Sequence, residues 1–139
     1  GPTIAELNRL KPKRIVILGG PSAVGTGVQV ALDAYTTGSV TRLAGANRYE
    51  TAKAISASKF APGVTVVYVA TGLNFPDALA AGPLAGLDQS PILLVETNSI
   101  PNPAAAELNR LKPKRIVIVG GTGVISTSVA NQLAGYTNP

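Results

Sequence analysis

The hydrophobic pattern alternates between two spacings along the chain and predicts strands that alternate with helices. Short runs of consecutive apolar, often β-branched residues indicate strands buried on both faces. Between them, apolar residues recur every three or four positions, as on one face of a helix. The predicted strands are 14–18, 40–43, 64–70, 91–95 and 115–119; the predicted helices are 4–10, one from Ser22 or Thr26 to about 34, 47–60, 75–87 and 103–111. This order favours an α/β fold with a mostly parallel sheet between two helical layers.

The sequence repeats itself at an offset of 101 residues. Residues 5–17 read AELNRLKPKRIVI, and residues 106–118 read the same. A period near 100 residues is typical of tandem modules the size of a domain, since solenoid repeats are shorter. We therefore interpret residues 3–37 as the C-terminal part of a preceding repeat and residues 38–139 as one complete repeat. The complete repeat would have four strands, to which strand 14–18 would add a fifth.

The leading fragment is too short to bury a core of its own. It would dock as an extra layer or edge on the complete repeat, or pair with another chain. Both alternatives are open from the sequence, and the second makes exchange of segments between copies a reasonable hypothesis.

Composition removes several classes of chemistry. The chain has no Cys and no His, which excludes thiolate and imidazole metal sites, disulfides, and Ser-His or Cys-His catalytic pairs. No two carboxylates are close enough in sequence to suggest paired-acid hydrolysis. From the residues alone, carboxylates brought together across the fold, for example with Glu50 or Glu96, stay open as an alternative. We expect no metal site and no cofactor.

The charge balance indicates an acidic partner. Twelve Lys and Arg against seven Asp and Glu give a net charge of +5, which suits nucleic acid, an anionic membrane surface or another anionic polymer. Only four Tyr, two Phe and no Trp are present, which argues against binding of single-stranded nucleic acid. No apolar run approaches the roughly 20 residues of a membrane span. No export signal is evident, and Gly1-Pro2 resembles the remnant of a protease cleavage, which would remove any signal upstream.

Eight of the twelve cations belong to the two repeated segments. Such residues usually lie solvated near a helix C-terminus, where they favour the helix dipole; the alternative is a repeated electrostatic footprint for an anionic polymer. The eight are Arg9, Lys11, Lys13, Arg14, Arg110, Lys112, Lys114 and Arg115.

Gly19-Gly20 follows a strand and precedes a helix, the place where nucleotide-binding folds hold phosphate. The pattern is neither G-x-G-x-x-G nor a P-loop. We interpret these glycines as a tight turn and keep a nucleotide- or phosphate-binding enzyme only as the least favoured alternative.

The segment 42–51 is the most distinctive junction between a strand and a helix. Asn47 is placed to cap the helix, and Glu50 occupies the acidic position of a capping box. Arg48 lies in the first helical turn, where the dipole disfavours a cation. We therefore expect Arg42 and Arg48 to hold a carboxylate within or between modules, with contact to an anionic ligand as the alternative.

The loop 71–77 carries two further polar candidates, Asn74 and Asp77. They could contact a ligand, but capping of the helix that begins near Phe75 is the favoured interpretation.

Four segments together resemble a known family. They are RLAGANRYETA at 42–52, VATGLNFPDALAAGPLA at 69–85, PILL at 91–94 and VIVGG at 117–121. In order and spacing they resemble the cell wall binding repeat type 2 family over residues 42–135, and residues 5–36 look like the end of a preceding repeat.

The resemblance implies a non-catalytic module with a Rossmann-like, three-layer α/β fold and a mostly parallel sheet of four to five strands. Such modules usually occur as three tandem copies around a pseudo-threefold axis. They anchor surface proteins of Gram-positive bacteria non-covalently, outside the cell, through an anionic secondary cell wall polymer. The resemblance assigns polymer attachment to Pro91, Ile92, Leu93 and Leu94, and charged motif positions to Arg42, Arg48 and Asp77.

Because this chain has one full copy, we expect it to form a homo-oligomer, with a trimer favoured. The main alternative function is a structural module for self-association whose wall binding is supplied by other domains.

Overall fold

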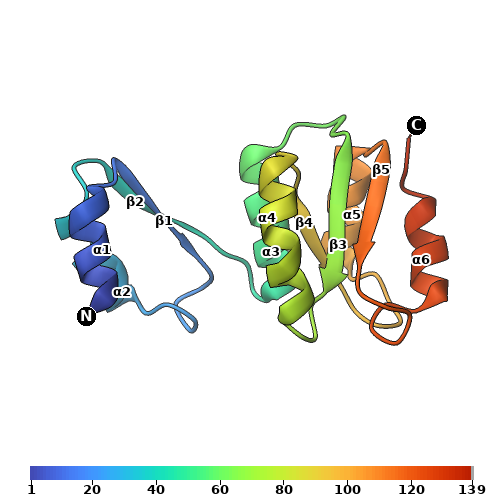
Figure 1. Cartoon of the computed structure of the whole chain (residues 1–139), viewed down its shortest axis with the longest axis horizontal. Helices are drawn as coiled ribbons and strands as arrows, with labels where there is room; N and C mark the ends of the chain where they lie inside the picture. The colour runs from blue at the N-terminus through green and yellow to red at the C-terminus, as the bar shows by residue number, and fades with distance from the viewer. Residues whose placement is uncertain (139) are drawn as a thin grey trace.

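The computed structural model describes residues 1–138 and divides them into two lobes (Figure 1). The head, residues 1–43, contains α1 (Pro2–Leu10), β1 (Arg14–Leu18), α2 (Thr26–Leu32), the short 3-10 helix η1 (Asp33–Tyr35) and β2 (Ser39–Leu43). The body, residues 48–138, contains α3 (Arg48–Lys59), β3 (Val66–Thr71), α4 (Pro76–Leu87), β4 (Ile92–Val95), α5 (Asn102–Leu111), β5 (Arg115–Val119) and α6 (Thr127–Ala134). Residues 44–47 join the two lobes.

The body is built on a parallel sheet with the strand order β4-β3-β5. Val69 of the central strand lies opposite Leu93 on one side and Ile118 on the other. All six residues of β3 are buried, as the uninterrupted apolar run predicts for a strand with neighbours on both sides and helices on both faces.

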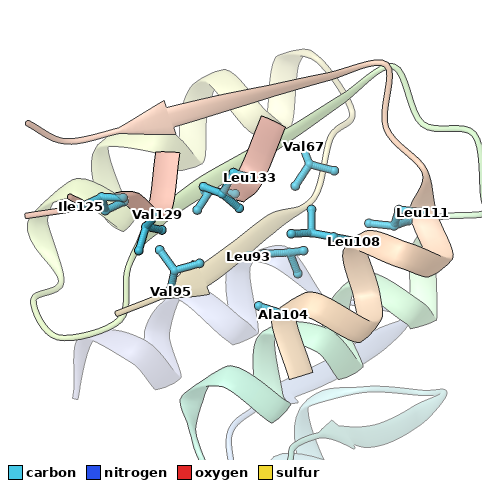
Figure 2. Packing of buried hydrophobic residues seen from close by; sticks show 10 residues of the cluster. Val67, Leu93, Val95, Ala104, Leu108, Leu111, Ile125, Val129 and Leu133 are labelled. Carbon is cyan, nitrogen blue, oxygen red and sulfur yellow. The ribbon is translucent and has the colours of Figure 1, made fainter. Parts of the chain in front are cut away.

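Helices cover both faces of the body sheet. On one face, α5 and α6 enclose the main aliphatic core (Figure 2), where Leu108 and Val129 meet Val67 and Val95 and are fully buried. On the other face, α4 packs Ala85 against Val66 and Tyr68. The residues that α4 buries, Ala81 and Ala85, have small side chains. The predicted α/β class with parallel strands between helical layers is confirmed.

The head has a separate sheet of two strands. β1 and β2 pair in parallel, with Arg14 opposite Ser39 and Leu18 opposite Leu43. Our expectation that residues 40–43 join the sheet of the complete repeat, giving four or five strands together, is therefore wrong for this structure: three strands form one sheet and two form another. The reason is that β2 finds in β1 an unpaired edge of the right polarity.

The head buries very little apolar surface. Ile17 is its one buried residue among those described, although the sequence predicts that β1 is covered on both faces. No second helical layer packs on this sheet, so Leu10 and Leu18 are each 56% exposed. The strand β1 thus has more apolar surface than the rest of the head covers.

α4 continues through Pro83 and ends at Leu87, so the proline does not shorten the helix. No helix within residues 1–138 has the length and apolarity needed to cross a membrane.

Candidate functional site

The junction between β2 and α3 is held by local hydrogen bonds. The Asn47 side chain caps α3, because its Oδ1 accepts from the Glu50 N–H at 2.9 Å. The Gly45 N–H donates to Thr51 Oγ1 at 3.0 Å, and a Cβ at Gly45 would overlap Glu50. The Glu50 carboxylate lies 4.0 Å from Lys53 Nζ on the helix surface. The turn is therefore fixed by the cap and a close backbone approach, and Glu50 does not hold either arginine.

Arg48 projects from the first turn of α3 toward the end of β3. Its Nη1 donates to the carbonyl oxygen of Gly72. The ring of Tyr49 packs on the same residue, where a Cβ would overlap it. Burial raises the pKa of the Tyr49 hydroxyl, and the carboxylate of Glu96 adds to that rise. Arg48 thus ties the start of α3 to the loop after β3 through a carbonyl rather than a carboxylate.

Arg42 belongs to the head, at the other side of the junction. Its Nε donates to Gln29 Oε1 at 3.0 Å, and its Nη1 donates to the carbonyl oxygen of Gly19 at 2.6 Å. The remaining Nη2 is buried and has no partner among the described residues. A guanidinium nitrogen removed from water without an acceptor is costly, so Arg42 has unused capacity for an oxygen from outside the head.

A hollow of ≈ 520 Å³ opens between the glycine turn of the head and the start of α3. Gly19 and Gly20 line one wall, and Asn47, Arg48 and Thr51 line the other. The lining combines one exposed cation with main-chain groups, which suits an anionic group. It has no pair of titratable groups poised for proton transfer.

An apolar groove of ≈ 950 Å³ adjoins this hollow between α3 and α4. Ala52, Ile55 and Leu94 line both spaces, so the two form one continuous depression. Pro91 and Ile92 also line the groove.

Leu93 points the other way, into the main core, and is only 1% exposed (Figure 2). Alternate residues of a strand face opposite sides, so the expectation that Leu93 contacts a polymer is wrong for this structure. The other three residues of the motif line the groove; Ile92 and Leu94 are partly exposed there, and Pro91 is buried.

Asn74 and Asp77 do not act as caps. Phe75 is the N-cap residue of α4, and no side-chain cap is formed there. Asn74 is exposed in the loop before the helix. Asp77 instead lies over the turn after β5, where Oδ2 is 2.9 Å from the position that a Cβ would take on Gly120. The favoured prediction of capping was therefore wrong, because the chain enters α4 through Phe75 and Pro76.

The repeated cations divide into two kinds. Most lie on the surface, and Arg9 pairs there with Glu6. Arg110, by contrast, donates to buried Glu107 and to the carbonyl oxygen of Phe60. This network was not predicted from the sequence. The signal available was the helical spacing, which puts Glu107 on the apolar face together with Ala104, Leu108 and Leu111.

Within the described part of the chain, no three His, Cys, Asp or Glu side chains gather as a metal site would require. Of the two junction arginines, Arg48 lines the hollow, whereas Arg42 lines neither the hollow nor the groove.

Known proteins resemble this chain along much of its length. The model of cell wall binding domain 2 (CWB2) matches residues 42–130. The chain is 36% identical over 95 residues to N-acetylmuramoyl-L-alanine amidase LytC of Bacillus subtilis, covering 68% of this chain and 19% of that protein. It is 34% identical over 131 residues to the amidase enhancer of Bacillus subtilis, covering 94% of this chain and 17% of the relative.

A solved structure shares the fold. Cwp6 from Clostridium difficile superposes with a TM-score of 0.86 and 28% identity, over 97% of this chain and 22% of that one. The chain thus spans about a fifth of the length of the proteins that it matches. Because the family match covers the capped α3 junction, the Asp77 helix and the PILL strand, the chain belongs to the cell wall binding domain 2 family.

Proposed function

We propose that this chain is a non-catalytic module that binds an anionic secondary polymer of the Gram-positive cell wall, and so holds a surface protein outside the cell without a covalent bond. The observation that carries the proposal is the CWB2 match over residues 42–130, which includes Arg48 and the other residues of α3 that line the hollow. The net charge of +5 supports an anionic partner.

The depression suggests how a polymer would lie. A negatively charged group would bind in the hollow near Arg48, and less polar parts would follow the groove past Pro91, Ile92 and Leu94. Each such contact is weak, but repeated sites along one polymer add through effective concentration. Binding that depends on exposed cations should weaken as salt screens them.

Sedimentation with purified walls tests this proposal. We expect the chain to sediment with walls at low salt and to be released at high salt. Arg48→Ala should weaken retention, whereas Arg14→Ala, the same loss of charge at an exposed position of the head, should have little effect. Equal weakening by both would show that binding follows net charge alone, and salt-independent retention would contradict the electrostatic mechanism. Retention on walls stripped of secondary polymer would identify peptidoglycan as the ligand instead.

The second candidate function is a module for self-association, with wall binding supplied by other domains. It is favoured by exposed apolar residues at and along α4: Phe75, Leu79, Leu84 and Leu87 are 55–81% exposed, and Phe75 and Leu79 line the groove. A helix that is apolar on all sides is usually buried. We propose that copies associate, with a trimer as the favoured state. Light scattering gives the oligomeric state, and an oligomer that fails to bind walls would support self-association as the sole function.

A further inference from the structure

The head and the C-terminal part of the body contain the same strand in two different settings. β1 and β5 have the same sequence at four of their five positions, RIVIL and RIVIV. β5 pairs with β3 and has no strand on its other edge within the described residues. β1 pairs with β2, and the edge that corresponds to the β3 side of β5 is empty there. Thus β1 has a strand only on the edge where β5 has none, and β5 has a strand only on the edge where β1 has none.

Backbone hydrogen bonds identify the two edges. In the head, the Gly19 N–H donates to the Leu43 carbonyl oxygen of β2 at 2.9 Å. The equivalent residue after β5 is Gly120, whose N–H has no backbone acceptor among the residues described. On the opposite edge, the Arg115 N–H donates to Thr65 on the β3 side at 3.0 Å. The free edge of β5 therefore matches the edge of β1 that holds β2.

The charges match as well. Arg42 of β2 binds the Gly19 carbonyl through Nη1 and leaves a buried Nη2 without a partner. In the body, the residue equivalent to Gly19 is Gly120, and Asp77 lies directly over it. No ion pair to Asp77 is present in residues 1–138. A β2 segment placed on β5 would therefore bring Arg42 beside a carboxylate that the head does not supply.

We propose that the free edge of β5 binds the β2 segment (Ser39–Leu43) of a second copy of this chain, and that Arg42 of that copy pairs with Asp77. Adding the offset of 101 residues to the β1 partners gives the register: Ser39 lies opposite Arg115, Thr41 opposite Val117 and Leu43 opposite Val119. The body sheet then has four parallel strands in the order β4-β3-β5-β2. The inference rests on the self-association proposed above.

Two physical reasons favour the movement of β2 from β1 of its own chain to β5 of a second copy. The strand that is lost and the strand that is gained offer nearly the same side chains, so the backbone pairing is kept. The head loses little on opening, because it buries so little apolar surface. The number of covered strand edges is unchanged, and a guanidinium–carboxylate pair is gained.

Disulfide trapping tests the register in a chain that contains no Cys. A Thr41→Cys copy is mixed with a Val117→Cys copy under mild oxidation. We expect the mixed disulfide to form well above the level of the mismatched pair, Thr41→Cys with Ile116→Cys, because neighbouring residues of a strand face opposite sides. Equal yields from the two mixtures would overturn the proposal. So would preferential trapping of Thr41→Cys by a Val16→Cys copy, because this would place β1 of the second chain beside β2.

Charge reversal tests the ion pair separately. Arg42→Glu in the Thr41→Cys copy and Asp77→Arg in the Val117→Cys copy should each reduce the mixed disulfide by about fivefold or more, and the two changes together, one in each copy, should restore most of it. Additive losses when both changes are present would contradict the pairing of Arg42 with Asp77. Circular dichroism of each variant checks that the body is folded. Wall sedimentation is read independently: loss of trapping with wall binding retained rejects this interface alone, and loss of wall binding with trapping retained rejects the wall-binding function alone.

Discussion

At the scale of single residues, the chain places one glutamate–arginine pair in two environments. Glu6 and Arg9 lie on the surface of α1, whereas Glu107 on α5 is 1% exposed. The Glu107 carboxylate accepts from Ser56 Oγ at 2.5 Å and from Arg110 Nη2 at 2.6 Å and Nε at 2.9 Å. Burial alone would raise the pKa of Glu107, but these hydrogen bonds and the nearby positive charges hold it below its ordinary value of 4.5. The buried copy therefore ties α3 to α5 as a satisfied anion.

Replacement of Glu107 should destabilise the body, and the identical position in the head provides the control. We expect Glu107→Gln to lower the free energy of unfolding at pH 7 by about 2–4 kcal/mol, because it leaves Arg110 without its partner charge. Glu6→Gln should change it by less than about 0.5 kcal/mol, as for most exposed pairs. Urea unfolding followed by circular dichroism measures both. Equal losses in the two variants would show that the burial of Glu107 carries no energetic weight.

The same carboxylate gives a pH dependence of defined sign. Because its pKa is lower in the folded chain than in the unfolded chain, the unfolded state binds the proton more readily. The contribution of Glu107 to stability is complete above about pH 4.5 and is lost as the pH falls through its folded pKa. The difference between the parent chain and Glu107→Gln should therefore shrink below that pH. A difference that grows on acidification would contradict this assignment.

At the scale of elements, α4 carries a helix breaker in its interior. Pro83 cannot donate the hydrogen bond that Leu79 would accept in a regular helix, and Gly82 precedes it. Both residues are exposed, and a Cβ at Gly82 would meet no atom within 4 Å. The low helix propensity of Gly82 and Pro83 is therefore not required by side-chain packing at these two exposed positions.

Two substitutions in α4 should stabilise the chain. Pro83→Ala should raise the free energy of unfolding by about 1–2 kcal/mol, because the gain in helix propensity exceeds the added freedom of the unfolded chain. Gly82→Ala should raise it by about 1 kcal/mol and serves as the reference for a simple propensity effect. Urea midpoints measure both. Destabilisation by Pro83→Ala alone would show that the proline sets a helix geometry that the core needs.

The elements themselves were predictable from the sequence, but the pairing of one strand was not. Periods of two and three to four residues place the strands and helices because they follow from local geometry. The partner of β2 depends on contacts between segments far apart in the sequence. Because β1 and β5 are nearly identical, local sequence does not decide which of them pairs with β2. At the site, the Asn47 cap is local and was predicted, whereas the carbonyl partner of Arg48 lies 24 residues away at Gly72 and has no local signal. Leu93 is buried because its side of β4 faces the main core. Four consecutive apolar residues do not indicate which side of the strand that is.

At the scale of the whole molecule, the two lobes should differ in local stability although they share a sequence. The body has a continuous core of ten buried residues, whereas the head has Ile17 alone among its described residues. Local opening free energies follow the number of buried apolar contacts. The head should therefore open without the body, and unfolding of the chain should depart from a single two-state transition.

Amide hydrogen exchange can measure the difference in local stability between the two lobes without a contribution from differences in intrinsic exchange rate. The N–H of Lys11 donates to Leu7 and the N–H of Lys112 donates to Leu108, both at 2.9 Å, at the ends of two helices that share the sequence AELNRL. Because the neighbouring residues are the same, the intrinsic exchange rates are the same, and any difference reports local stability. We expect the amides at the end of α5 to be protected at least about a hundredfold more than those at the end of α1. NMR is the suitable readout, because it resolves residues that short identical peptides cannot.

Equal protection of α1 and α5 would mean that the exposed Leu10 is covered in solution, as its equivalent Leu111 is in the body. The cover would then have to come from another chain, since no described residue of this one packs there. Dilution separates the cases: protection that falls with concentration belongs to an assembly, whereas protection that does not fall would contradict the division of the chain into a weak head and a stable body. Low protection of α1 at all concentrations, together with β2 trapped on β5, would mean that copies join through the strand while the rest of the head stays open.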